Sequence, residues 1–180
     1  MSAALESLSR ALSVHMPSLR IQAGVPLAPY TSFEVGGPAD LLVIAEDATQ
    51  LQQAVALAQE HQVPWTVLGS GTNVLVADEG VRGLVIINAT QGLQMAGDGL
   101  VVAASGPLLC ELARWAVDSG WRGLQWAIGI PGTLGGAVVG NAGAYGGCMA
   151  DIVRWVRLLR PDGVVERVPV EALAYGYRIS

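Results

Sequence analysis

The chain has 180 residues, enough for one domain with a sizeable core or for two small lobes. Hydrophobic residues make up 52% of it and charged residues 14%, so it can bury enough apolar surface to fold and is not expected to be disordered. The net charge is −5 and lysine is absent, which argues against a nucleic-acid surface, because binding to a phosphate backbone needs clustered lysine and arginine.

The sequence also indicates a location and excludes a metal site. No apolar run reaches the length of a membrane span, and residues 1–20 lack the apolar core of a signal peptide, so we expect a cytoplasmic protein without membrane contact. Cys110 and Cys148 fit neither a metal knuckle nor a disulfide framework, and His15 and His61 have no ligand partners nearby in the sequence. We therefore expect no bound metal.

Hydrophobic spacing predicts a helix and a linker within residues 1–24, because Leu5, Leu8, Leu12 and Met16 fall on one helical face. Residues 25–93 are predicted to form a first lobe, which starts with a turn-rich segment and the buried strand DLLVIAE. A helix capped by Asp47 or Thr49 follows, and then come three strands, WTVLG, NVLVAD and GLVIIN. This order predicts a β-α-β-β-β lobe.

Residues 94–180 are predicted to form a second lobe. Gly97-Asp98-Gly99 lies between two strand-like runs and predicts a hairpin. The spacing of apolar residues over 107–119 predicts a helix, with Gly120 as its C-terminal cap. Two further strands are predicted on either side of Pro161-Asp162-Gly163. No low-complexity linker separates the two lobes.

The turn LGSGTN has the glycine, hydroxyl and amide content of a phosphate-binding nest, in which successive N–H groups point at an anion. It is not a P-loop, since no lysine follows the last glycine, and it is not a Rossmann turn, since it is predicted to lead into a strand rather than a helix. Alone, the turn is equally compatible with a simple β-turn. The candidate residues are Leu68, Gly69, Ser70, Gly71, Thr72, Asn73 and Val74.

The segment IGIPGTLGGAVVGNAGAYGG, residues 128–147, is the most glycine-rich part of the chain. Glycine lets the main chain approach a ligand closely, Pro131 fixes one φ angle, and Asn141 adds an amide side chain. Two interpretations stay open from the residues alone, a tightly packed turn and a cradle for a flat, phosphate-bearing cofactor.

Taken together and in this order, SFEVGGPAD, LGSGTNVLV, GIPGTLGGAVVGNAGAYG and GYRIS resemble the UDP-N-acetylenolpyruvoylglucosamine reductases, also called UDP-N-acetylmuramate dehydrogenases or the MurB family. The resemblance covers roughly residues 25–180. It implies an α+β fold of the vanillyl-alcohol-oxidase (PCMH) type, with FAD bound non-covalently between two α+β lobes. The departures from the family pattern are Cys148, Glu34 and Gly140.

The resemblance also implies which residues bind FAD. Leu68 to Val74 would hold the pyrophosphate, Ala104, Ser105 and Gly106 would line the cofactor cleft, and the glycine-rich segment would flank the flavin. In that segment, the implied residues are Ile128, Gly129, Ile130, Pro131, Gly132, Thr133, Gly135, Gly136, Asn141 and Ala142. Main-chain amides in such places would hold the cofactor and tune its electron affinity.

The activity implied by the resemblance is a two-step reduction, in which NADPH reduces FAD and the reduced flavin then reduces the enolpyruvyl ether of a UDP-sugar. The product is a peptidoglycan precursor, UDP-N-acetylmuramate. Arg178 in GYRIS matches the family's catalytic arginine, and a guanidinium suits negative charge that develops beside a carboxylate. Tyr177 and Tyr145 are implied to position the substrate.

Members of this family continue beyond the point that matches Ser180, with a substrate-binding third domain that supplies the proton donor and a late glutamate. We therefore expect a truncated FAD-binding part with little or no activity alone. Two alternatives remain, a sugar or alcohol oxidase of the same superfamily and a non-catalytic FAD-binding or interaction module. The sequence does not fix the oligomeric state.

Overall fold

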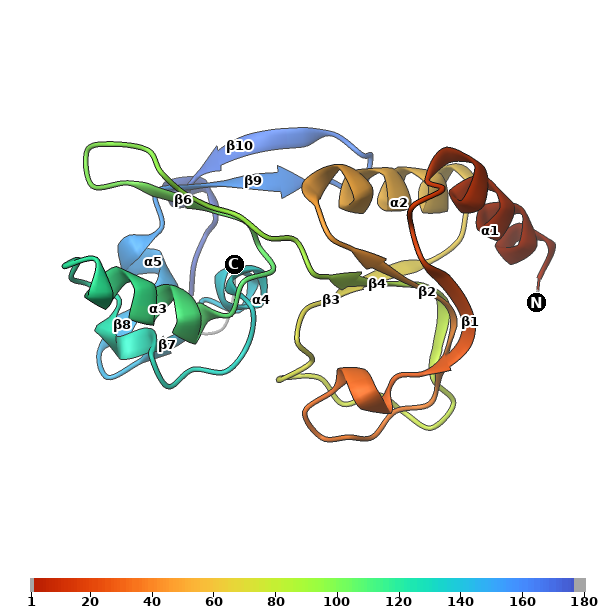
Figure 1. Cartoon of the computed structure of the whole chain (residues 1–180), viewed down its shortest axis with the longest axis horizontal. Coiled ribbons are helices and arrows are strands. Elements are labelled where there is room, and N and C mark those ends of the chain that lie inside the picture. Colours follow the sequence, from red (N-terminus) through yellow and green to blue (C-terminus); the bar gives the residue numbers. More distant parts are fainter. Residues whose placement is uncertain (1, 177–180) are drawn as a thin grey trace. The chain divides into compact units, whose positions relative to one another are not determined.

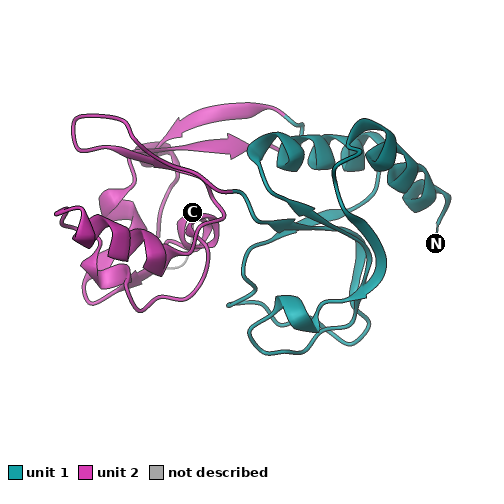
Figure 2. Ribbon diagram, viewed as in Figure 1, with its two compact units in different colours: residues 1–90, 161–163 teal, residues 91–160, 164–180 magenta. Residues whose placement is uncertain are grey.

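The computed structural model of the chain describes residues 2–176 and contains two compact units. Figure 1 shows the order of the elements along the chain, and Figure 2 colours the units. Unit 1 runs to Thr90 and includes Pro161–Gly163, and unit 2 comprises the residues from Gln91 to Arg160 and from Val164 onward.

Unit 1 is built on a four-stranded sheet in the order β1-β2-β4-β3, formed by β1 (Ile21–Pro26), β2 (Pro38–Ala45), β3 (Trp65–Leu68) and β4 (Val81–Asn88). The strands β2 and β3 both pair with β4 in parallel, whereas β1 pairs with β2 antiparallel. The central strands β2 and β4 are continuous apolar runs with most side chains buried, as expected for strands covered on both faces.

Two helices lie along the same side of this sheet in Figure 1, α1 (Ala3–His15) and α2 (Ala48–Glu60). The predicted N-terminal helix is confirmed, because Leu5, Leu8 and Leu12 are buried on α1. The start of α2 is set by Asp47, whose side chain accepts a 2.8 Å hydrogen bond from the main-chain amide of Gln50. Of the two caps that the sequence left open, the structure selects Asp47.

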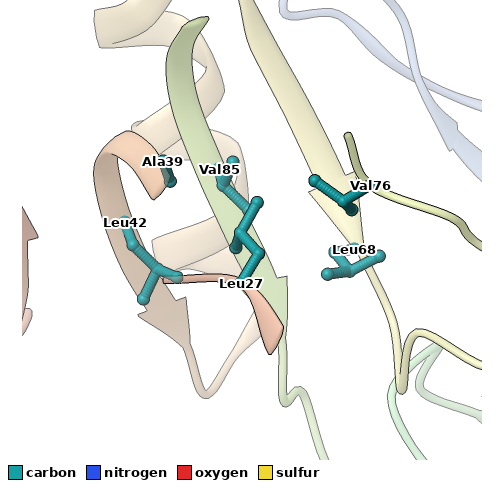
Figure 3. Close-up of a cluster of buried hydrophobic side chains, with 6 residues drawn as sticks. All are labelled: Leu27, Ala39, Leu42, Leu68, Val76 and Val85. Atoms are coloured by element: carbon teal, nitrogen blue, oxygen red, sulfur yellow. The ribbon is translucent and has the colours of Figure 1, made fainter. Parts of the chain in front are cut away.

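The predicted strand NVLVAD is wrong, because residues 73–78 form a loop without a neighbouring strand. The alternating apolar residues anchor this loop instead. Val76 is 9% exposed and packs into a core cluster that Figure 3 shows, whereas Leu75 is 75% exposed. The other members of the cluster are Leu27, Ala39, Leu42, Leu68 and Val85.

The turn-rich segment predicted before DLLVIAE was also only partly correct. Its beginning contains the strand β1, which the sequence did not reveal because Gly24 and Pro26 are poor strand residues. The first unit therefore has the order β1-β2-α2-β3-β4 after its first helix, rather than β-α-β-β-β.

Unit 2 begins with the predicted hairpin, formed by β5 (Leu93–Met95) and β6 (Val101–Ala103). The predicted helix is α3 (Leu109–Asp118), which ends before Gly120 at a φ of 78°. The predicted strands on either side of Pro161–Gly163 are β9 (Trp155–Leu159) and β10 (Val165–Pro169), paired antiparallel. All three predictions are thus confirmed.

The glycine-rich segment of unit 2 contains more regular structure than its composition suggests. It includes α4 (Leu134–Val139) and a short hairpin of β7 (Gly143–Ala144) and β8 (Gly147–Cys148), which is followed by α5 (Met149–Ile152). Three 3₁₀ turns complete the elements of the described part of the chain, η1 (Ala28–Tyr30), η2 (Gln125–Ala127) and η3 (Val170–Ala172). Unit 2 has its own core, centred on Leu109, Ala113, Ala127, Ala137 and Met149.

Across residues 2–176, none of the helices combines the length and the apolar composition that crossing a membrane requires.

The packing of Val76 generates a stability test. Val76→Ala removes two methyl groups from the core under the loop, so we expect the free energy of unfolding to fall by about 2 kcal/mol. Leu75→Ala, at the exposed neighbouring position, should change it by less than about 0.5 kcal/mol. Denaturant unfolding of both variants measures the difference, and equal losses would contradict the assigned loop.

Candidate functional site

The turn after β3 offers main-chain amides that have no partner in the protein. None of the amides from Gly69 to Asn73 donates a hydrogen bond to another atom of residues 2–176. The carbonyl oxygens of the same loop are used, because Gly71 O accepts from the amide of Ser32 at 3.1 Å and Ala77 O accepts from that of Gly37 at 2.9 Å. The loop is thus held by its carbonyls and keeps its N–H groups available.

Gly71 is required where it stands. Its φ is 64°, in the left-handed region, and a Cβ there would overlap the carbonyl oxygen of Tyr30. This close approach brings the turn against the segment Tyr30–Ser32. The sequence motif SFEVGG therefore supports the turn, a role that its composition alone did not reveal.

A hollow of about 280 Å³ lies beside this turn, within unit 1. Hydroxyl-bearing and small residues line most of it, and no charged side chain contributes. An anion placed there would meet amide and hydroxyl dipoles rather than lysine or arginine, which is the chemistry of a main-chain nest. The lining residues are Pro29, Tyr30, Thr31, Ser32, Gly69, Ser70 and Ile87.

In unit 2, the structure brings together two of the segments that the sequence assigned to the cofactor. The amide of Gly135 donates to Ser105 O at 2.8 Å, and a Cβ on Gly135 would lie 2.9 Å from that of Ser105. Leu134 donates to Pro107 O at 2.8 Å, and Gly132 O accepts from Leu109 at 2.9 Å. Residues 104–106 and 132–136 therefore lie side by side.

The start of the glycine-rich segment is open. The amides of Gly129 and Gly132 donate no hydrogen bond within the described residues, and a Cβ on Gly129 would meet no atom within 4 Å. Ile128, next to it, is 47% exposed. Thr133 is buried, and its hydroxyl accepts from the amide of Gly136 at 3.3 Å to begin α4. This stretch combines unpaired amides with free space around them, as the turn of unit 1 does.

The residues after α4 are organised around Asn141, which has a φ of 42°. Its side-chain Nδ2 donates to Gly176 O at 2.9 Å, and its Oδ1 accepts from the amide of Ala150 at 3.0 Å. Ala142 is part of the same connection, because its amide donates to Ala137 O and its oxygen accepts from Met149. The side chain of Asn141 is therefore used within unit 2.

Tyr145 is almost fully exposed, at 95%, in the turn between β7 and β8. Its φ of 51° is unusual for an aromatic residue. Gly147 on β8 packs against the indole of Trp126, where a Cβ would overlap the ring, so the hairpin has a fixed support. The sequence gave no indication of this support. The two other residues assigned to catalysis and substrate, Tyr177 and Arg178, lie outside the described residues.

Comparison with known proteins identifies the class of protein. The profile of the family described as "FAD binding domain" matches residues 39–169. The chain belongs to this family of FAD-binding domains, and the fold expected from the sequence is confirmed.

The relatives narrow the class to the reductases that the sequence motifs resemble. A UDP-N-acetylenolpyruvoylglucosamine reductase of Synechococcus is 47% identical over 171 residues, which are 94% of this chain and 55% of that protein. One from Rubrobacter xylanophilus is 48% identical over 157 residues, or 86% of this chain and 52% of the relative. The chain thus matches the FAD-binding portion of these reductases and spans about half their length.

Solved structures agree. The reductase from Thermus caldophilus has a TM-score of 0.74 and 35% identity, covering 89% of this chain and 56% of that one. A berberine-bridge-enzyme-like protein of Physcomitrella patens, titled BBE-like 1, has a TM-score of 0.65 at 19% identity, covering 92% of this chain and 38% of that one. This second likeness shows the fold alone.

Tyr175 gives a test of the packing near the end of the described chain. Its hydroxyl is buried without a hydrogen-bond partner, and burial, with a smaller contribution from Cys148, raises the pKa of the phenol above its usual value of 10. Because the unfolded chain ionises first, the protein should lose stability as the pH rises above about 10. Tyr175→Phe should remove this loss and should stabilise the protein at neutral pH by up to about 1 kcal/mol.

Denaturant unfolding between neutral and alkaline pH measures both effects. Tyr145→Phe is the control at an exposed position and should leave the pH dependence unchanged. A destabilised Tyr175→Phe at neutral pH would show that the hydroxyl has a partner.

Proposed function

We propose that this chain binds FAD non-covalently and forms the FAD-binding part of a UDP-N-acetylmuramate dehydrogenase. The observation that carries the proposal is the run of unpaired amides from Gly69 to Asn73 beside a hollow without charged side chains. Such a site suits a pyrophosphate, whose oxygens accept several hydrogen bonds. The family membership and the named reductases support the same assignment.

We assign the pyrophosphate to Leu68–Val74 and the flavin to the glycine-rich part of unit 2. There, Ile128–Gly136 would contact the flavin through main-chain groups, supported from behind by Ala104, Ser105 and Gly106. Ala142 and the main chain of Asn141 would continue this surface. The residues present fit the cofactor because both segments leave amides free and have space next to them.

The chemistry that FAD supplies when bound is the transfer of a hydride, with NADPH as the proposed donor and an enolpyruvyl UDP-sugar as the proposed acceptor. The chain's own contribution would be Arg178, whose permanent positive charge would stabilise negative charge developing beside the substrate carboxylate. Tyr177 and the exposed Tyr145 would contact the substrate. In this role, the protein would act in peptidoglycan precursor synthesis in the cytoplasm.

The direct test is the flavin absorbance of the purified chain, before and after addition of FAD and removal of the excess. We expect the yellow spectrum of bound flavin. Release of unmodified FAD by denaturation would support non-covalent binding. A chain that neither carries nor takes up FAD would contradict the proposal and would favour a module without a flavin.

Substitution of Gly71 tests the turn of unit 1. Gly71→Ala puts a methyl group against Tyr30 O at a left-handed φ and displaces the turn, so the FAD dissociation constant should rise about tenfold or more. Gly97→Ala is the matched control, because Gly97 also has a positive φ, 77°, but has no atom within 4 Å of the added Cβ. Fluorescence titration with FAD measures both, and equal affinities would contradict the assigned turn.

Gly129 tests the flavin surface without disturbing the fold. The added methyl of Gly129→Ala meets no protein atom within 4 Å, so the free energy of unfolding of the cofactor-free chain should stay the same. A flavin against this residue would be displaced, and the FAD dissociation constant should rise about tenfold. Unchanged FAD affinity would place the flavin elsewhere.

A further inference from the structure

The side chain of Asn141 joins three parts of unit 2 that are distant in sequence. Asn141 follows α4, Ala150 lies in α5, and Gly176 is the last described residue. One amide group donates to the carbonyl of Gly176 at 2.9 Å and accepts from the N–H of Ala150 at 3.0 Å. Both distances are those of ordinary hydrogen bonds.

Asparagine meets three requirements of this position at once. Its φ of 42° lies in the left-handed region, which asparagine adopts more readily than most residues. Its side chain has both a donor and an acceptor, whereas an ionised aspartate has only acceptors. It is also neutral, so it adds no carboxylate close to the chain end.

The carbonyl of Gly176 is two residues before Arg178. Since consecutive Cα atoms are 3.8 Å apart, the Cα of Arg178 lies within about 7.6 Å of that of Gly176. An anchor on Gly176 therefore restricts where the backbone of Arg178 can start, whatever path the next residues take. Gly176 has no side chain of its own with which to fix its position.

We infer that Asn141 is a positioning residue, which holds the main chain at Gly176 so that Arg178 can act on a carboxylate-bearing substrate. The role of Arg178 rests on the proposed function, whereas the anchor itself does not. Asn141 would act through Gly176 and would not contact the flavin with its side chain. Its neutral amide leaves the guanidinium of Arg178 free to pair with the substrate carboxylate.

Two variants separate the anchor from other effects. Asn141→Asp keeps the acceptor for Ala150 and the left-handed φ but loses the donor to Gly176 O. Asn141→Gly keeps the φ and the neutral charge but loses both hydrogen bonds. We expect both variants to release residues 170–180, which hydrogen exchange measured by mass spectrometry detects as faster exchange, while α3 keeps its protection.

The functional readout uses the FAD-loaded chain. In both variants, the FAD dissociation constant should stay within about twofold of the original, because the side chain of Asn141 does not contact the cofactor. Titration with UDP-N-acetylglucosamine enolpyruvate should perturb the flavin absorbance of the original chain, with an affinity about tenfold higher than in either variant. Arg178→Ala should show a similar loss of this response, without the change in hydrogen exchange over residues 170–176.

Several results would overturn the inference. Unchanged exchange over residues 170–180 in both variants would exclude the anchor, and weaker FAD binding would make Asn141 a cofactor residue. An effect of Asn141→Asp without one of Asn141→Gly would assign the change to the added charge. If the original chain binds FAD but does not respond to the UDP-sugar, the link to Arg178 is wrong. Failure to bind FAD at all would overturn the proposed function, while the exchange data would still decide whether the anchor exists.

Discussion

Unit 1 depends on a loop whose path is fixed without using its own amides. Unpaired amides usually destabilise a folded chain, so a segment that leaves them free needs other contacts. Here Val76 is buried in the core below the loop, while the carbonyls of Gly71 and Ala77 accept hydrogen bonds from a neighbouring segment. The loop is therefore rigidly attached on one side and presents N–H groups on the other, which is the arrangement a bound anion needs.

Unit 2 solves the same problem with different elements. The carbonyl of Gly132 is used by Leu109, and Gly135 packs against Ser105, yet the amides of Gly129 and Gly132 remain available. In neither place does binding rely on lysine, which the chain lacks entirely. An acidic protein can hold a negatively charged cofactor in this way because aligned main-chain dipoles, unlike charged side chains, do not change the net charge.

The incorrect strand at NVLVAD shows the limit of reading periodicity. Alternation indicates that some side chains are buried, but a strand also needs a partner that pairs with its main chain. Val76 satisfies the first condition, and no strand lies beside the loop to satisfy the second. The error matters for function, since a paired strand would have used amides that the loop leaves free. The strand β1 was missed for the opposite reason, because its pairing with β2 outweighs its unfavourable composition.

The sequence by itself determined the features that depend on neighbouring residues. These include the buried faces of α1 and α3, the Asp47 cap of α2, the hairpin turns and the two glycine-rich segments, together with the family whose motifs they match. Only the tertiary structure decided which amides stay unpaired and what Asn141 binds. The carbonyl that Asn141 holds belongs to a residue 35 positions away, so no local pattern could reveal it. Hydrogen bonds between distant residues form only when the chain folds, and they decide here which polar groups remain for a ligand.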